Sequence, residues 1–295
     1  MEGFKIKVSV TIPTYNNLES FKRTLNSVLC QTFSDFEIII TDDSENDDIK
    51  IYTALLNDER IKYFKNPQKM GAPKNWNEGI KKAQGEYVKI LHHDDWFADE
   101  NSLKKFVELM DKNPQCDFGY SKSVDFNVET KKIKTRKAEK YVSKIEKNPF
   151  ELYLCNRIGS PSVVIFRNKN DLLFDENLKW LVDLDLYIEA LIRNNKIAFI
   201  NKVLVNIGIS QAQITNSCQD NQKVEIYELF YLYNKYKKNL DNNKYYPKLT
   251  EALKRFKICT LEKLREIIPQ EFEIPERIIN KLSGKKKCLK DLLHL

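Results

Sequence analysis

The 295-residue chain is short of glycine and histidine, with 8 and 3 residues respectively. It contains neither a GxGxxG segment nor a GxxxxGK[ST] loop. It therefore lacks the glycine-rich turns with which dinucleotide-binding dehydrogenases and P-loop enzymes hold phosphate groups. Its 6 cysteines stand singly, without a CxxC pair, which argues against a zinc ribbon and against a small disulfide framework. Scattered cysteines of this kind are typical of a reducing compartment, so we expect a cytoplasmic protein.

The sequence also lacks long apolar runs, since no stretch approaches the roughly 20 residues that a membrane-spanning helix needs. The first residues enter a strand pattern without the apolar core of a signal peptide, so we expect neither export nor membrane insertion. The formal net charge is +7, but lysine and glutamate alternate along most of the chain, as on solvated helix faces. With 42% hydrophobic residues we expect a globular protein, and the charge alone does not indicate a nucleic-acid partner.

Short β-branched runs predict strands at residues 7–12, 36–40, 61–64, 87–91, 117–124, 161–167 and 196–200. Between the first two, apolar residues fall at helical spacing over residues 18–29, and a second helix is expected over residues 182–194. Strand, helix and strand in repetition predict an α/β fold with a mainly parallel sheet flanked by helices. From about residue 219 the pattern becomes helical, with aromatic and leucine stripes that are typical of packing surfaces.

Polar clusters follow three of the predicted strands: PTYN after the first, TDDSENDD after the second and HHDDW after the fourth. Each cluster alone is most simply a turn, because Asp, Asn and Pro end strands for backbone reasons. In a parallel sheet, however, ligands bind beyond the carboxyl ends of the strands, so three clusters in this position indicate a binding site. The imidazoles and carboxylates of HHDDW suit a divalent metal, and they equally suit the polar end of a strand.

Two long segments resemble the family 2 glycosyltransferases with the GT-A fold: VSVTIPTYNNLESFKRTLNSVLCQTFSDFEIIITDDSENDD and NPQKMGAPKNWNEGIKKAQGEYVKILHHDDWFADENSL. The resemblance covers about the first 210 residues. It implies a Rossmann-like GT-A domain over residues 1–218, with a donor half at about 1–115 and an acceptor half at about 116–218. A helical C-terminal region would then occupy residues 219–295.

The same resemblance implies an inverting enzyme that moves a sugar from a nucleotide-diphosphate sugar to a hydroxyl group, usually with Mn²⁺ or Mg²⁺. The implied acceptor is a glycan or a lipid-linked molecule in bacterial surface polysaccharide or lipooligosaccharide synthesis. Two other readings stay open, a catalytically impaired nucleotide-sugar-binding protein and a sugar nucleotidyltransferase. The sugar, the linkage and the oligomeric state are not encoded in any motif that we recognise.

The family's motifs place the donor nucleotide against the first two clusters. Pro13, Thr14 and Tyr15 would frame the base, with Tyr15 as the stacking surface. Asp43 would accept a hydrogen bond from the base, which favours a UDP-sugar because a carboxylate accepts from the imide N–H of uracil. Its neighbour Asp42 would point to the other side of the strand.

The segment GAPKNWNEGI supplies further donor-side candidates. Lys74 stands where the family often has an arginine, and it would keep a positive charge for the diphosphate without a bidentate contact. Alternatively, Lys74 is only the exposed first turn of a helix begun at Pro73. Asn75 is a weaker candidate for the same pocket, and Trp76 is expected in the core.

The family's DxD-type metal motif falls on HHDDW. His92 takes the place of the first acid, His93 the intervening position, beside the donor nucleotide, and Asp94 the second acid. Asp94 and His92 are therefore the implied metal ligands, and Asp95 would support the loop or the sugar. An imidazole suits Mn²⁺ better than Mg²⁺. A protonated His92 that bonded the diphosphate would instead make the metal less essential, so metal dependence stays open.

Inverting transfer requires a base that takes the proton of the acceptor hydroxyl. The family's ED-like motif falls on LKWLVDLDLYIEALI, with Asp183 as the base and Val182 in place of the usual first acid. Asp185 is the alternative, but two positions along a helix it faces another direction.

Three further segments have open roles. The basic residues 131–147 form an exposed loop or lid, or else a plain surface excursion. Residues 206–217 stand where relatives often carry a histidine-bearing loop; here Ser210 and Gln213 would make its contacts. The tail from Lys285 to Leu295 is either a basic amphipathic helix on anionic lipid, placing the protein peripherally on the inner face of the membrane, or a helix packed on its own domain.

Overall fold

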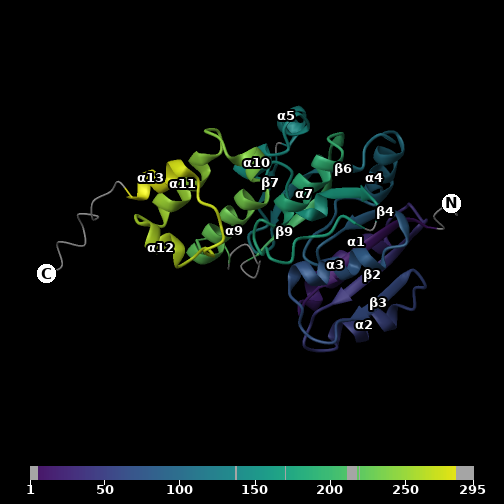
Figure 1. Cartoon of the computed structure of the whole chain (residues 1–295). Helices are drawn as coiled ribbons and strands as arrows, with labels where there is room; N and C mark the ends of the chain where they lie inside the picture. Colours follow the sequence, from purple (N-terminus) through teal and green to yellow (C-terminus); the bar gives the residue numbers. More distant parts are fainter. Residues whose placement is uncertain (1–5, 137, 170, 211–217, 219, 284–295) are drawn as a thin grey trace. The chain divides into compact units, whose positions relative to one another are not determined.

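The computed structural model describes residues 6–136, 138–169, 171–210, 218 and 220–283. The described residues form two compact units (Figure 1). The first comprises Met1–Leu152, Asn156–Asn177 and Val182–Gln211, and the second comprises Tyr153–Cys155, Leu178–Leu181 and Ala212–Leu295. No helix in the described part of the chain is both long and apolar enough to span a membrane.

The first unit is built on one mixed sheet. Its strands are β1 (Ile6–Thr14), β2 (Phe36–Asp42), β3 (Ile61–Lys65), β4 (Gly85–Ile90), β5 (Trp96–Phe97), β6 (Phe118–Asn127), β7 (Ile133–Thr135), β8 (Val164–Arg167) and β9 (Ile197–Ile209). Its helices are α1 (Leu18–Leu29), α2 (Asp48–Leu56), α3 (Ala72–Lys82), α4 (Ser102–Asp111), α5 (Val142–Lys147) and α7 (Val182–Arg193), with the 3₁₀ turns η1 (Glu139–Tyr141) and η2 (Pro161–Val163).

The sheet has the order β3-β2-β1-β4-β8-β6-β9-β5, and β7 pairs with the outer part of β6. The first four strands are parallel, as the alternation of strands and helices predicts. Beyond β4 the sheet is mixed, because β8 runs antiparallel to both β4 and β6 whereas β6 and β9 are parallel. The predicted α/β fold is therefore correct, and its parallel part is the half that carries the three polar clusters.

The central strands β1 and β2 are buried on both faces, and their few polar residues, Ser9, Thr11 and Glu37, are buried with them. Val8, Val10 and Ile12 of β1 and Ile38 and Ile40 of β2 have no exposed surface. Helix α3 packs on β1 and β2, and α2 lies beside β3. The carboxyl ends of these strands are thus held in a rigid frame, from which their polar residues emerge.

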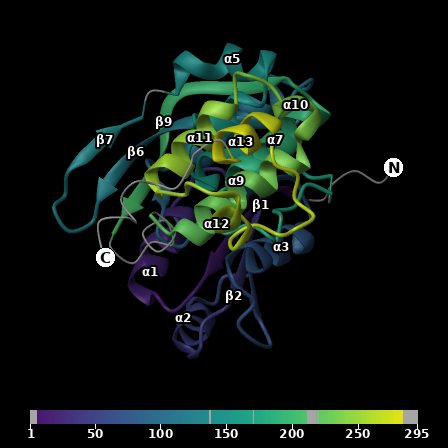
Figure 2. The ribbon, with the colours of Figure 1, turned by 60° about the vertical axis from the view of Figure 1, so that its left-hand side comes forward.

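The basic segment 131–147 is more ordered than the expected loop or lid. It contains β7, which pairs with β6 in the register Val124↔Thr135, Asp125↔Lys134 and Phe126↔Ile133. It then forms η1 and α5. Figure 2 shows β6 and β7 running side by side. A three-residue strand is too short to leave a readable alternation in the sequence, which is why pattern analysis misses it.

The second unit contains the short helix α6 (Glu151–Leu154) in part, and the helices α9 (Gln222–Lys235), α10 (Lys237–Leu240), α11 (Tyr246–Arg255), α12 (Leu261–Arg265) and α13 (Glu276–Ser283). Its aromatic stripe packs internally, since the rings of Tyr227, Tyr231 and Phe272 lie 5.6 to 6.0 Å apart. The Glu228 carboxylate accepts hydrogen bonds from the backbone N–H groups of Lys179 and Leu181, at 2.7 Å each. The expected tail, residues 285–295, and Gln213 lie outside the described residues.

Candidate functional site

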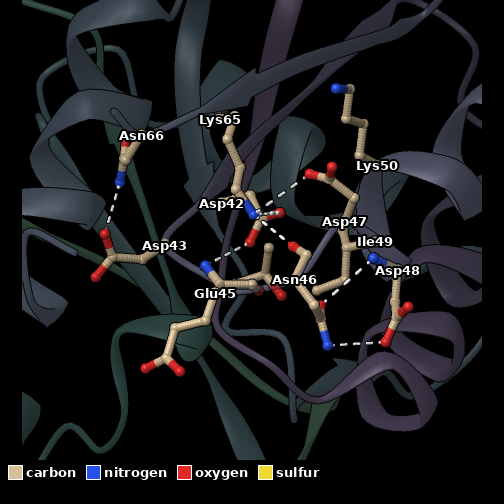
Figure 3. A network of polar contacts seen from close by, with 12 residues as sticks. Asp42, Asp43, Glu45, Asn46, Asp47, Asp48, Ile49, Lys50, Lys65 and Asn66 are labelled. Atoms are coloured by element: carbon tan, nitrogen blue, oxygen red, sulfur yellow. Dashed lines mark hydrogen bonds and ion pairs between the residues drawn. The ribbon is translucent and has the colours of Figure 1, made fainter. Parts of the chain in front are cut away.

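Two adjacent aspartates at the end of β2 point to opposite sides of the strand, as their positions predict. Asp42 is fully buried, and its carboxylate accepts from Tyr63 Oη at 2.6 Å and from Lys65 Nζ at 3.3 Å. Figure 3 shows Lys65 reaching toward Asp42 while Asp43 turns away toward Asn66. Asp42 has no exposed surface, whereas Asp43 is 6% exposed, so Asp43 is the member of the pair that can face a ligand.

Asp43 organises the loop that leads into α3. Its carboxylate accepts from the backbone N–H groups of Met70 at 2.7 Å and Gly71 at 2.9 Å, and from Asn66 Nδ2 at 3.1 Å. Gly71 has φ of +86°, a left-handed conformation that favours glycine. A carboxylate has about four acceptor positions, and three are filled, so one remains for a donor group from outside.

The other donor-side candidates differ in what they offer a ligand. Pro13 and Thr14 are buried at the end of β1, and Tyr15 is half-buried. The Tyr15 hydroxyl lies 3.1 Å from Glu45 Oε1, and Lys69 Nζ lies 4.3 Å from the ring centre. One face of this expected stacking surface is therefore covered by an amine on an exposed side chain.

Asn75 and Lys74 occupy the first turn of α3 in different roles. Asn75 is buried, and its Nδ2 donates to the carbonyls of Thr14 at 3.3 Å and Thr41 at 3.2 Å. The Asn75 amide thus joins the carboxyl ends of β1 and β2 and fixes this edge of the sheet. Lys74 is exposed, with its amine 4.0 Å from Glu176, and keeps its charge available at this edge of the sheet.

Residues 92–95 form a turn whose backbone is bonded by side chains of α1. The N–H of Asp95 donates to the carbonyl of His92 at 2.9 Å. The Thr24 hydroxyl lies 2.8 Å from the carbonyl of His93 and 2.6 Å from that of Asp95. Arg23 donates to the carbonyl of Asp94 at 3.2 Å. The backbone of the turn is therefore fixed by contacts that do not use its side chains.

The side chains of His92, Asp94 and Asp95 meet, with one possible ligand atom from each lying within 4.8 Å of the others. Ligands on opposite sides of Mg²⁺ at about 2.1 Å are about 4.2 Å apart, so only a small rotation separates this set from a shared ion. His92 Nε2 is buried and has no hydrogen-bond partner. The Asp95 carboxylate, by contrast, accepts from the N–H of Gly208 at 3.0 Å and from Ser160 Oγ at 3.2 Å. His92 and Asp94 therefore fit a divalent cation, and Asp95 supports the turn.

Burial sets the charge of this cluster. It lowers the pKa of His92 to about 4, and the neighbouring His93 and Lys89 add to the effect while Asp94 opposes it. Trp76 shields the imidazole, with the ring centres 4.5 Å apart, so this tryptophan forms a half-buried wall of the site instead of part of the core. A neutral imidazole offers a nitrogen lone pair, which favours metal binding over the alternative of a protonated His92 on the diphosphate.

The expected base lies in the first turn of α7. Asp183 is half-buried; its Oδ2 accepts from Asn156 Nδ2 at 2.7 Å, and its Oδ1 accepts from the N–H of Leu184 at 2.9 Å. Asp185 has no exposed surface, so it cannot meet an acceptor hydroxyl without rearrangement. The geometry favours Asp183 over Asp185.

One loop, residues 156–162, contacts both Asp183 and the turn of residues 92–95. Pattern analysis of the sequence does not identify this loop. Asn156 binds Asp183, Ser160 binds Asp95, and the Ser162 hydroxyl accepts from the N–H of His92 at 2.9 Å. The signal was the turn-rich stretch NRIGSPS before a strand. It lies before β8 because β8 is antiparallel to β4, so the amino end of β8 meets the carboxyl end of β4.

Lys89 is a second residue that pattern analysis misses, because it stands in an otherwise apolar strand. It is fully buried on β4, and its amine donates to the carbonyls of Ile90, at 2.7 Å, and Ser162. Burial lowers the pKa of Lys89 to about 7, while Asp95 opposes that shift. Lys89 thereby ties β4 to the loop that carries Ser162.

Thr24→Val tests the support of the turn. We expect the free energy of unfolding to fall by about 1–3 kcal/mol, because the carbonyls of His93 and Asp95 lose the single hydroxyl donor that they share. Thr53→Val is the matched control, since the Thr53 hydroxyl bonds only carbonyls of its own helix, at 2.9 Å. Urea denaturation of both variants measures the difference. Equal losses would mean that Thr24 does not hold the turn.

Similar sequences share this architecture. A family model described as "Glycosyl transferase family 2" matches residues 9–184. An uncharacterized glycosyltransferase of Methanocaldococcus jannaschii is 30% identical over 82% of this chain and 84% of its own length. One of Rickettsia conorii is 32% identical over 75% of this chain but 35% of its own length, so the chain spans about a third of that relative.

A shorter match carries a more specific name. The GalNAc(5)-diNAcBac-PP-undecaprenol beta-1,3-glucosyltransferase of Campylobacter jejuni is 41% identical over 92 residues, which is 30% of each chain. Its name describes a lipid-linked acceptor for that protein.

Solved structures show the same fold. TarS of S. aureus in complex with UDP-GlcNAc superposes with a TM-score of 0.62 at 23% identity, over 77% of this chain and 65% of that one. The mannosyltransferase PcManGT of Pyrobaculum calidifontis, in complex with GDP-Man and Mn²⁺, gives a TM-score of 0.58 at 13% identity, over 78% and 64%. The family model covers more than half of the chain, and the fold agrees with it: the chain belongs to the family 2 glycosyltransferases and has the GT-A fold.

Proposed function

We propose that the protein transfers a sugar, with inversion, from a UDP-sugar to a hydroxyl group of a lipid-linked or glycan acceptor. The observation that carries this proposal is the continuity of the site. Asp43, the His92 and Asp94 pair, and Asp183 lie far apart in the sequence, yet they are connected. Asn66 joins Asp43 to Asn75, Trp76 next to Asn75 contacts His92, and the loop 156–162 contacts both His92 and Asp183.

The donor nucleotide is assigned to the edge beside Asp43. The remaining acceptor position of its carboxylate suits the imide N–H of uracil, which supports a uridine donor. Pro13, Thr14 and Tyr15 border the same edge, where the partly exposed Tyr15 ring would stack on the base. Lys74 would supply positive charge for the diphosphate.

His92 and Asp94 are the residues that would hold Mn²⁺ or Mg²⁺. A bound cation would neutralise the charge that grows on the departing diphosphate. Asp95 keeps the turn in place through Gly208 and Ser160, and Trp76 excludes water from one face of the imidazole. An imidazole ligand favours Mn²⁺ over Mg²⁺.

Asp183 is assigned the proton transfer. As the acceptor oxygen bonds the anomeric carbon, the bond from that carbon to the diphosphate breaks, and the hydroxyl proton passes to the Asp183 carboxylate. Asn156 holds the carboxylate by its Oδ2 atom, so the orientation of the base is set before the acceptor arrives.

The acceptor and the pathway are proposed from the relatives. The acceptor in the Campylobacter enzyme's name supports a lipid-linked glycan, and with it a role in bacterial surface polysaccharide or lipooligosaccharide synthesis. An enzyme with such an acceptor would work in the cytoplasm at the inner face of the membrane.

Thermal stabilisation by nucleotides tests the donor assignment, because a ligand that binds only the folded protein raises its melting temperature. We expect UDP with Mn²⁺ to raise the Tm more than GDP, CDP or dTDP do, and chelator to remove most of the rise. A larger rise in Tm with another nucleotide than with UDP would overturn the uridine assignment. A UDP shift that ignores chelator would overturn the metal assignment, and no shift from any nucleotide would favour an impaired binding protein.

A further inference from the structure

The hairpin of β6 and β7 carries an exposed isoleucine among lysines. Ile133 is 63% exposed, and Lys131, Lys132 and Lys134 are exposed around it. None of the three lysines pairs with an acid among the described residues. The exposed Glu129 offsets one of these charges. Lys131 Nζ lies 5.8 Å from the centre of the Phe126 ring, which is opposite Ile133, whereas Lys134 follows Ile133 in β7 and points to the other face of the hairpin. The hairpin therefore presents an apolar side chain on a ribbon that carries positive charge on both faces.

Other charges on the hairpin are already neutralised. Arg136 Nε lies 2.8 Å from Asp125, and Lys122 Nζ lies 3.6 Å from Glu139. The unpaired charge is thus concentrated near the β6–β7 turn and on β7 itself, beside Ile133.

Apolar side chains in contact with one another connect this hairpin to the turn of residues 92–95. Ile133 stands directly opposite Phe126, so their side chains share one face of the hairpin. The Phe126 ring meets the edge of Trp96 with the ring centres 5.3 Å apart. Trp96 follows Asp95 in the chain, and all three side chains are partly or largely exposed. A surface that binds Ile133 therefore lies next to the site at which the sugar is transferred.

We propose that the β6–β7 hairpin rests on an anionic membrane surface, with Ile133 entering the lipid interface and Lys131, Lys132 and Lys134 beside the lipid phosphates. An isolated exposed isoleucine needs no partner, but one on a hairpin whose neighbouring lysines pair with no acid matches a surface that is anionic outside and apolar beneath. The inference rests on the proposed function in one respect: a lipid-linked acceptor is found at such a surface.

Flotation with lipid vesicles tests the charged part. The full chain is mixed with phosphatidylcholine vesicles that contain about 30% phosphatidylglycerol, and with vesicles of phosphatidylcholine alone. A lysine near an anionic surface contributes about a fivefold change in partitioning, so Lys131→Gln, Lys132→Gln and Lys134→Gln together should weaken binding on the order of a hundredfold. The matched control removes the same charge from α2, α3 and α4, through Lys50→Gln, Lys81→Gln and Lys104→Gln, and should change binding only a few-fold.

The apolar part is tested with Ile133→Ser, which should weaken binding to the anionic vesicles by about tenfold. Ile51→Ser on α2 is its control, because Ile51 is similarly exposed, at 59%, and lies outside the hairpin. Hairpin variants that bind vesicles as well as the unchanged protein would overturn the proposal and assign membrane binding to another part of the chain. Hairpin variants that lose no more binding than the controls would also overturn it, by showing only a net-charge effect.

Vesicle binding needs neither donor nor acceptor, so it separates this inference from the proposed function. Loss of vesicle binding in the hairpin variants supports the inference even if UDP-sugars are never turned over. A protein that glycosylates a water-soluble acceptor normally, but whose hairpin variants bind vesicles unchanged, keeps the function and loses the membrane contact.

Discussion

Asp183→Asn is expected to lower the turnover of sugar transfer by about 10³-fold, since general base catalysis typically contributes 10²–10⁴-fold. Asparagine has nearly the same shape and still accepts the hydrogen bond of Asn156, so the fold and the loop 156–162 should persist. It cannot take a proton. Steady-state kinetics with a UDP-sugar measures the loss, and the rise in melting temperature produced by UDP with Mn²⁺ should stay unchanged.

A graded companion separates the base from its support. Asn156→Ala leaves the carboxylate but removes the donor at 2.7 Å from its Oδ2, together with the acceptor of the Ile158 and Gly159 N–H groups, so turnover should fall by at least about tenfold. Near-normal turnover in Asp183→Asn would move the base elsewhere, with Asp185 as the next candidate despite its burial. A large loss in Asn156→Ala with near-normal turnover in Asp183→Asn would mean that Asn156 acts through the loop 156–162 and not through Asp183.

Asp94→Asn is expected to remove the metal-dependent part of donor binding. The carboxylate is the hard, charged oxygen ligand of the cluster, and an amide oxygen replaces it poorly. Turnover should fall on the order of 10²–10³-fold, the usual effect of losing one group that stabilises the charge of the transition state. The rise in melting temperature with UDP should become the same with Mn²⁺ and with chelator.

Glu108→Gln is the control for this variant. It removes one negative charge from an exposed position on α4, 3.8 Å from Lys112, and should leave both readouts unchanged. His92→Gln completes the set, because it removes the ring nitrogen but leaves Asp94. We expect this variant to lose its preference for Mn²⁺ over Mg²⁺. If Asp94→Asn keeps the full response to Mn²⁺, the metal ligands have been assigned incorrectly.

The parallel half of the sheet was predictable because β1, β2 and β4 are mostly buried on both faces. Runs such as FEIII in β2 are apolar apart from Glu37, and the polar residues after them mark the ligand-binding edge. The opposite directions of Asp42 and Asp43 also follow from strand geometry alone. These features depend on local pattern, which the sequence records directly.

The support of the site was not predictable in the same way. The loop that carries Asn156, Ser160 and Ser162 lies at the carboxyl end of β4 only because β8 is antiparallel to its neighbours. The direction of a strand leaves no trace in local composition. Lys89 sits in a strand that otherwise reads as apolar, and its burial depends on the carbonyl of Ser162, 73 positions away. Trp76 gives no local sign that it faces His92.

The loop 156–162 has a consequence for acceptor size. It contacts Asp183 at Asn156 and the turn of residues 92–95 at Ser160 and Ser162, so one short covalent segment fixes the separation between the proposed base and the proposed metal ligands. The length of this segment therefore sets that separation. Inserting or deleting a single residue in it would change the length of acceptor that fits between the two ends, while every side chain that performs the chemistry stayed the same.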